Sequence, residues 1–432
     1  MMLSFCGGKH LSSYKQLTKD KPIKDFPLPK QVVLPLIQHI GAPAEVLVKV
    51  GDLVKTGTKI AEAKKLISSP VHSSISGTVS KIVDAPHPVL GKCKSIYIDS
   101  DGLDTFDPAI VKRNNYANLS KDELLAIIKS AGIVGLGGAA FPTCVKLNPP
   151  CPIDSFIINA VECEPYLNCD FRLMLERTED ILQGILLVKR ILNVDNVFIG
   201  IEADKPQAIA VMRTAVRKLN LAIDVVSLKT KYPQGAEKQL IKAVLGREVP
   251  SGKLPFDAGV VVNNVATILS VYDAVALSKP LYERVITVTG KALKEPANLK
   301  VRIGTKFKEI IAYCHVGTKP VSKIIMGGPM MGLAQFTDDL PVIKGTSGIL
   351  LLAEDEGCEF EQQPCIRCGR CVDVCPMRLL PYALSLCAQK RSFDLARAYN
   401  PFDCIECGLC TYVCPANRKI VEQIKLTKIV LK

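Results

Sequence analysis

The sequence reads CIRCGRCVDVCP at 365–376 and CIECGLCTYVCP at 404–415. Each copy follows the pattern C-x2-C-x2-C-x3-C-P, and together they hold eight of the 17 cysteines. This spacing is typical of proteins with two 4Fe-4S clusters, in which the fourth cysteine of each run ligates the cluster of the other run. The pattern therefore predicts a first cysteine set of Cys365, Cys368, Cys371 and Cys414, and a second cysteine set of Cys404, Cys407, Cys410 and Cys375.

Two other uses of these cysteines compete with iron–sulfur ligation. Structural zinc usually pairs two C-x2-C knuckles, which leaves the third and fourth cysteine of each run unexplained. Disulfides belong mainly to oxidising compartments, and the N-terminus MMLSFCGGKH has no signal-peptide layout. Iron–sulfur ligation is favoured because it accounts for all eight residues. Gly369 and Gly408 would let the backbone bend so that its N–H groups face the inorganic sulfides.

The composition narrows the class of protein. A chain of 432 residues is long enough for about three domains of ~150 residues each. It has no run of about eighteen uninterrupted apolar residues, which predicts a protein that is soluble or held at a membrane by partners. The net charge of +13 is scattered along the chain, and no nucleic-acid-binding motif occurs, so we expect no nucleic acid partner. A basic surface suits acidic redox partners or an anionic membrane face.

Residues 1–110 are expected to form an N-terminal β domain. VKVGDLVKTGTKIAEA (48–63) and SSPVHSSISGTVSKI (68–82) alternate short strand patterns with glycine turns, as in a barrel-sandwich hybrid of the biotinyl/lipoyl type. Lys65 lies near the position of the modified lysine in such domains. The usual sequence context of that lysine is missing, so an ordinary surface lysine is the favoured interpretation.

Three further domains are expected after residue 110. Residues 111–282 alternate helix and strand patterns, which predicts a Rossmann-like α/β domain with ligands at the carboxyl ends of the strands. Residues 283–356 return to strand patterns and resemble a soluble-ligand-binding β-grasp (SLBB-like) module. Residues 357–432 form the helical, ferredoxin-like domain of the two clusters. The predicted fold class is therefore α/β, with several domains.

A glycine-rich loop, GLGGAAFPTCVK, runs from 135 to 146 in the α/β domain. Its glycines would let backbone N–H groups approach a phosphate. Lys146 would add a point charge for that phosphate, and Phe141 an apolar face for an aromatic ring. A tight turn with a packed phenylalanine is the alternative. The glycines concerned are Gly135, Gly137 and Gly138.

Two polar stretches strengthen the ligand hypothesis. NAVECEPY (159–166) directly follows a predicted strand, and VVNNVATI (261–268) places consecutive amides in an apolar run. Buried amides need partners, which a ligand could supply. Helix caps or satisfied buried amides are the alternative for each stretch, but all three motifs together favour a ligand site. Its polar residues would be Asn159, Glu162, Glu164, Asn263, Asn264 and Thr267.

These three motifs together resemble the FMN- and NADH-binding flavoprotein of respiratory complex I. The whole chain, in domain order, resembles the RnfC family, whose members are components of the Rnf-type ion-translocating electron-transport complex. The matching phrases are FCGGKHLSSYKQLTKDKPI (5–23), QHIGAPAEVLVKVGD (38–52), SSPVHSSISG (68–77), YPQGAEKQLI (232–241) and MGGPMMG (326–332). The resemblance covers essentially the full length.

The resemblance implies an NADH-linked oxidoreductase subunit with FMN, two 4Fe-4S clusters and NAD(H) as a substrate. Electrons would pass between NADH and ferredoxin, and partner subunits in the membrane would couple this flow to Na+ or H+ translocation. A flavin suits this role because it exchanges hydride and single electrons. The chain would be peripheral, on the cytoplasmic face of the cell membrane. Its electron-transfer partner would be ferredoxin or an iron–sulfur protein of the same complex.

The resemblance also implies the residues of the pocket. Contacts to FMN are implied for Gly135, Gly137, Lys146, Asn159, Glu162, Asn263, Asn264 and Thr267. The NADH side is implied for Gly138, Phe141, Glu164, Glu237, Lys253 and Phe256. No residue is assigned an acid–base role. The chain departs from the flavoprotein pattern at Ala140, Val161, Ala236 and Ala266, where the pattern has a glycine and three acidic residues.

Three other functions compete with this one. A flavin- and iron–sulfur-containing cobalamin reductase shares the later domains but lacks the N-terminal barrel and the GGKH opening (7–10). A non-enzymatic electron-wiring subunit would keep the clusters without a flavin. Homology to the first component of a Na+-pumping quinone reductase would leave the eight cluster cysteines unexplained.

Overall fold

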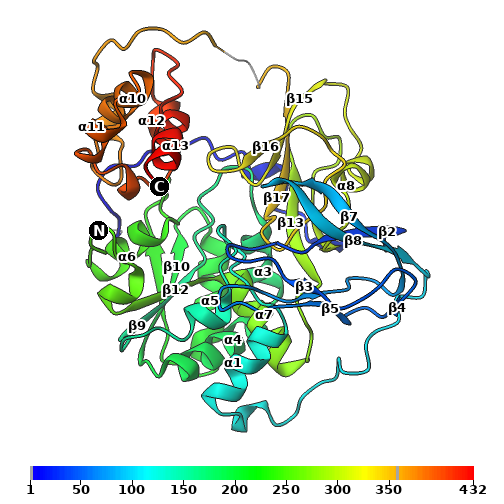
Figure 1. Cartoon of the computed structure of the whole chain (residues 1–432). Coiled ribbons are helices and arrows are strands. Elements are labelled where there is room, and N and C mark those ends of the chain that lie inside the picture. The colour runs from blue at the N-terminus through cyan, green and yellow to red at the C-terminus, as the bar shows by residue number, and fades with distance from the viewer. Residues whose placement is uncertain (1–2, 357–359) are drawn as a thin grey trace.

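A computed structural model describes residues 3–356 and 360–432 of the chain (Figure 1). The N-terminal part forms two small antiparallel sheets, ordered β2-β8-β7-β4 and β3-β5-β6. Apolar residues alternate along these strands, and the inward ones, such as Val32, Leu34, Ile96 and Ile98, are fully buried or nearly so. The strands are β2 (Gln31–Pro35), β3 (Glu45–Val46), β4 (Leu53–Val54), β5 (Lys59–Glu62), β6 (Val71–His72), β7 (Gly77–His87) and β8 (Gly91–Ser100).

The next part is a four-stranded parallel sheet, ordered β11-β10-β9-β12, with helices on both faces. Phe156 and Ile158 of β9 pack with α1, α3, α4, α5 and α7 on one face, whereas Ile157 packs with α6 on the other. The strands are β9 (Ser155–Asn159), β10 (Asn196–Glu202), β11 (Asp224–Leu228) and β12 (Val260–Asn264). The helices are α1 (Lys121–Ser130), α2 (Thr143–Lys146), α3 (Cys169–Glu176), α4 (Thr178–Leu192), α5 (Pro206–Lys218), α6 (Glu237–Leu245) and α7 (Val265–Ala276).

The third part is a mixed six-stranded sheet, ordered β1-β14-β13-β17-β15-β16, that packs with helix α8 (Phe307–Tyr313) around its own core. Its edge strand β1 (Ile23–Asp25) comes from the N-terminal segment and pairs with β14, so the beginning of the chain joins this sheet. The other strands are β13 (Glu283–Thr289), β14 (Ala297–Arg302), β15 (Val321–Met326), β16 (Leu333–Gln335) and β17 (Gly348–Ala353).

The last part is helical and lies above the α/β sheet in Figure 1, in orange and red. Leu384, Ile420 and Ile424 form its apolar core together with cluster cysteines. Within the described residues 360–432 it contains helices and no strand. The helices are α9 (Arg370–Asp373), α10 (Pro381–Gln389), α11 (Phe393–Arg397), α12 (Leu409–Tyr412) and α13 (Ile420–Leu431).

Across residues 3–356 and 360–432, none of the helices combines the length and the apolar character that crossing a bilayer requires.

Candidate functional site

The strand order of the α/β sheet locates its ligand edge. The chain moves from β9 outward to β10 and β11, and then returns to the opposite side of β9 as β12. Ligands of such sheets bind where the order reverses, at the carboxyl ends of the strands. Asn159 ends β9, and Asn264 ends β12 as its direct neighbour in the sheet. The structure therefore brings these two predicted residues together at the reversal.

The glycine loop lies against this edge. The Leu136 N–H donates to Thr267 Oγ1 of α7 over 2.8 Å, and the Gly135 N–H donates to the Phe141 carbonyl over 2.9 Å, which closes the loop. A Cβ at Gly137 would lie only 2.8 Å from Asn264 Cβ, so a side chain there would displace the asparagine. Gly138 is exposed and has no neighbour within 4 Å of a Cβ position, so its backbone is open to a ligand.

The two asparagines at the end of β12 have different surroundings. Asn264 caps α7, since its Oδ1 accepts from the N–H groups of Ala266 (2.9 Å) and Thr267 (3.3 Å). Asn263 is only 4 % exposed, and its Nδ2 has no hydrogen-bond partner among the described residues. A buried amide donor without a partner is costly, so Asn263 fits a site that is completed by an oxygen-rich ligand such as FMN.

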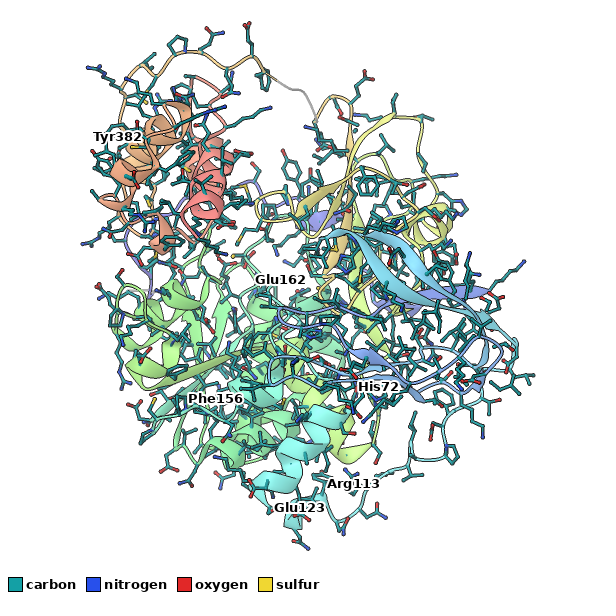
Figure 2. The ribbon with its side chains drawn as sticks, in the orientation of Figure 1. His72, Arg113, Glu123, Phe156, Glu162 and Tyr382 are labelled. Carbon is teal, nitrogen blue, oxygen red and sulfur yellow. The ribbon has the colours of Figure 1, made fainter. Side chains whose placement is uncertain are left out.

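Glu162 is a helix cap. Its carboxylate accepts from the N–H groups of Asp170 (2.8 Å) and Phe171 (3.2 Å), at the first turn of α3. Lys15 donates to the Glu162 carbonyl over 2.7 Å and lies 3.9 Å from its carboxylate. Burial and the Glu162 charge raise the pKa of Asp170 to about 7. Glu162 lies near the centre of the molecule, between the α/β part and the mixed sheet (Figure 2).

One group of side chains at this edge has the spacing of metal ligands. Ligand atoms of Glu162, Cys169 and Asp170 lie within 4.8 Å of one another. Both carboxylates already accept hydrogen bonds from protein N–H groups, which include the Asn264 side chain at 2.6 Å. We assign no metal to this group, because its oxygens have protein partners.

The residues assigned to the NADH side are spread over a wider area. Glu164 accepts from the N–H groups of Met330 (3.2 Å) and Met331 (2.8 Å), so it holds the MGGPMMG loop of the mixed sheet. Burial raises the pKa of Glu164 to about 7. Glu237 is paired with Lys146 at 2.5 Å, and each side chain is about a third exposed (37 % and 32 %).

Two residues of the NADH assignment lie elsewhere. Phe256 belongs to the 3-10 helix Pro255–Ala258, which directly precedes β12. Asn263 and Asn264 lie at the carboxyl end of the same strand, so the structure places Phe256 at the opposite edge of the sheet. Lys253 is exposed in the loop before this 3-10 helix. The structure does not bring Phe256 to the site.

The cluster cysteines converge in two crosswise groups. Cys375, Cys404, Cys407 and Cys410, the second cysteine set, line one cavity of the helical domain. Burial raises the pKa of Cys407, and the nearby thiols of Cys404 and Cys375 raise it further. In the first set, burial and then Cys368 and Cys414 raise the pKa of Cys371. Groups of four soft sulfur donors fit 4Fe-4S clusters.

One contact joins the two halves of the site and has no counterpart in the sequence assignments. The Tyr232 hydroxyl donates to the carbonyl of Cys407 over 2.8 Å, so the α/β part touches the second cysteine set directly. Tyr232 is buried with Leu11, Cys407 and Leu409. The phrase YPQGAEKQLI contains this tyrosine, and its apolar ring after a predicted strand was the available signal.

Two buried cations behind the glycine loop were also missed. Arg284 of β13 donates to the carbonyls of Leu136 (3.3 Å) and Lys344, and burial lowers its pKa to about 10. The Lys344 ammonium donates to Ser69 Oγ (3.0 Å) and to the carbonyls of Pro70 (2.7 Å) and Gly132 (2.8 Å). Burial lowers the pKa of Lys344 to about 7. Three parts of the chain therefore meet beneath the glycine loop.

Four known domain families match successive parts of the chain. These are the RnfC barrel sandwich hybrid domain at residues 3–103, the Nuo51 FMN-binding domain at 128–273, the SLBB domain at 285–334, and the 4Fe-4S dicluster domain at 364–418. Their identities and order confirm the fold class predicted from the sequence, together with an FMN-binding and a two-cluster domain.

A solved structure of low sequence identity shares the fold. The NAD+-reducing [NiFe]-hydrogenase in the H2-reduced state superposes with a TM-score of 0.53 at 18 % identity, over 75 % of this chain and 65 % of that chain. At this identity the likeness concerns the fold alone.

Curated relatives match the chain over nearly its full length. The RnfC-type component of the proton-translocating ferredoxin:NAD(+) oxidoreductase complex of Clostridium ljungdahlii is 49 % identical, over 99 % of this chain and 94 % of that protein. The corresponding component of the Na(+)-translocating complex of Acetobacterium woodii is 44 % identical, over 98 % and 96 %. That of the ion-translocating oxidoreductase complex of Rhodobacter capsulatus is 44 % identical, over 88 % and 74 %. With this identity and coverage, the chain belongs to the RnfC family of the Rnf-type ion-translocating oxidoreductase complexes.

Proposed function

We propose that this chain is the electron-input component of a membrane-bound, ion-translocating oxidoreductase and exchanges electrons between NADH and ferredoxin. The observation that carries the proposal is the contact between Tyr232 and Cys407. It joins the ligand edge of the α/β sheet to one of the two cysteine sets. NADH gives up two electrons together with one proton, as hydride, whereas each 4Fe-4S cluster takes one electron, so two clusters match one NADH.

The residues at the sheet edge would hold FMN. Bound FMN would supply the exchange between hydride and single electrons. The open backbone at Gly138 and the unpartnered amide of Asn263 offer donors to the cofactor. Lys146 brings a positive charge, which Glu237 balances in the described structure. Asn159, Asn264 and Thr267 would act mainly by fixing the strand ends and the loop.

The two cysteine sets would have different neighbours. The second set lies against the α/β part through Tyr232, and Gln239 of α6 donates to the Pro376 carbonyl beside it over 3.3 Å. In the first set, Cys365 and Cys368 are exposed. We therefore place the second set nearest to the flavin and the first set nearest to the partner protein.

The partners would be the membrane subunits and a ferredoxin-like protein. The net charge of +13 suits an acidic partner or an anionic membrane face. We propose a peripheral location on the cytoplasmic face of the membrane. We also propose the domain bounds 1–110, 111–282, 283–356 and 357–432 for this chain, which agree in order with the matched families.

Two rival functions are disfavoured by specific observations. A cobalamin reductase of the kind considered above lacks the N-terminal barrel, whereas residues 3–103 match the RnfC barrel family. A cluster-only wiring protein needs no flavin site, whereas the buried Asn263 amide is left without a partner among the described residues.

The test is an anaerobic NADH titration of the full chain, reconstituted with FMN, iron and sulfide. We expect about eight iron atoms per chain, bleaching of the flavin absorption by NADH, and EPR signals of reduced clusters. Lys146→Ala should weaken FMN binding about tenfold, whereas the exposed Lys253→Ala should bind FMN like the wild type. A wild-type protein that binds no FMN and shows no NADH-dependent bleaching would exclude the proposal.

A further inference from the structure

The N-terminal segment 5–11, FCGGKHL, lies between the α/β part and the cluster domain. In Figure 1 the blue trace from the N-terminus runs along the lower side of the orange and red helices. Lys9 and Tyr232 exchange two backbone hydrogen bonds, each 2.9 Å long. On the other side, the Gly8 N–H donates to the Val374 carbonyl over 2.9 Å. The segment is therefore bonded to both parts at once.

The two glycines of this segment allow an unusually close approach. Gly7 has φ +74°, and a Cβ there would lie 2.6 Å from the carbonyl oxygen of Cys375. Gly8 has φ +72°, and a Cβ there would lie 2.7 Å from the Tyr232 carbonyl oxygen. Any side chain would push these backbones apart, because carbon and oxygen do not pack this closely. Cys375 belongs to the second cysteine set.

The segment also continues toward the ligand edge of the sheet. Leu11 is buried together with Tyr232, Cys407 and Leu409. Four residues further on, the buried Lys15 ammonium donates to the carbonyls of Glu162 and Leu167, each over 2.7 Å. One stretch of chain thus connects the backbone of the second cysteine set to the loop after β9.

We propose that residues 5–11 act as a wedge that fixes the second cysteine set at its distance from the flavin edge. Domains joined by a linker move relative to each other unless an interface holds them. The wedge supplies such an interface through backbone hydrogen bonds and glycine contacts. Its role is to position the cluster for receiving electrons, one per cluster from each NADH, and it holds neither cofactor itself. This inference rests on the proposed function.

The test compares Gly7→Ala with Gly91→Ala in the reconstituted full chain. Gly91 has the same φ of +74°, but nothing lies within 4 Å of its Cβ position, so the two variants share the backbone strain and differ in the clash. After rapid mixing with NADH, flavin bleaching is followed by absorption and cluster reduction by freeze-quench EPR. We expect unchanged iron and FMN contents in both variants. The ratio of cluster reduction to flavin bleaching should fall about tenfold in Gly7→Ala alone.

A second measurement does not depend on cofactor activity. In Gly7→Ala, hydrogen exchange of the Gly8, Lys9 and Tyr232 amides should be faster than in Gly91→Ala. Equal rate ratios in the two variants would overturn the proposal, and so would a loss of iron in Gly7→Ala, because the segment would then hold the cluster. If the wild type shows no NADH-dependent bleaching, the proposed function fails. Exchange then still decides the wedge, since unprotected amides in the wild type would refute it.

Discussion

Arg284 illustrates how a single side chain can shape a binding loop from another part of the molecule. It is 5 % exposed and lies on the mixed sheet, yet two of its guanidinium nitrogens donate to carbonyls beneath and beside the glycine loop. Its Nε has no partner among the described residues. A buried carbonyl that loses its donor costs about 1–3 kcal/mol, so Arg284 stabilises the conformation of the loop at Leu136.

We predict that Arg284→Gln weakens FMN binding about tenfold, because the Leu136 and Lys344 carbonyls lose a charged, forked donor. Arg284→Lys keeps the charge but loses the fork, so its affinity should be intermediate. The measurement is fluorescence of FMN released on dilution. Arg302→Lys is the matched control, since Arg302 of β14 pairs with Asp104 of the N-terminal part and Glu283 instead. Wild-type affinity in Arg284→Gln would contradict the assigned role.

At the scale of elements, the start of α7 and the glycine loop form one unit. Asn264 caps the helix, Thr267 of its first turn accepts from Leu136, and Gly137 lies against the Asn264 side chain. The cap satisfies helix N–H groups that would otherwise lack partners. Because the same asparagine also limits the space at Gly137, the loop and the helix cannot move independently.

We predict that Gly137→Ala destabilises the apoprotein by about 1–3 kcal/mol, because the new methyl group overlaps Asn264 Cβ. Gly135→Ala should have a smaller effect, since its Cβ would lie 3.7 Å from the nearest atoms, which belong to Phe141. Thermal unfolding of the two apoproteins, followed by circular dichroism, makes the comparison. Equal midpoints would mean that Asn264 can shift without cost.

At the scale of the whole molecule, the chain is held together by contacts between parts that are distant in sequence. Lys344 bonds the N-terminal barrel and the α/β part, and β1 pairs with β14 of the mixed sheet. The cysteine sets follow the same principle, because Cys375 groups with cysteines of the later run. Each set therefore needs both runs of the cluster domain.

We predict that Cys375→Ser removes the cluster of the second set while leaving FMN binding unchanged. Iron should fall to about half of the wild-type value of about eight atoms. Cys365→Ser should remove the other cluster, so the two variants should lack different EPR signals. Loss of FMN along with iron in both variants would point to general unfolding.

The sequence alone determined much of the site, because its signals are local. The cysteine spacing named both sets, and the polar residues after two predicted strands, Asn159 and Asn263, lie at adjacent strand ends as expected for a parallel sheet. The family and the fold class predicted from the sequence are confirmed by the matches. The assignment of FMN and NADH contacts to individual residues stays a prediction.

Tertiary structure alone decided how these pieces meet. Tyr232 and Cys407 are 175 positions apart, and Gly7 reaches Cys375 from the other end of the chain. Arg284 and Lys344 look like ordinary surface cations in the sequence, yet both are buried behind the glycine loop. Phe256, close to the site in sequence, lies at the far edge of the sheet. Spacing reveals which residues share a turn or a strand, whereas contacts between domains depend on packing that no local pattern records.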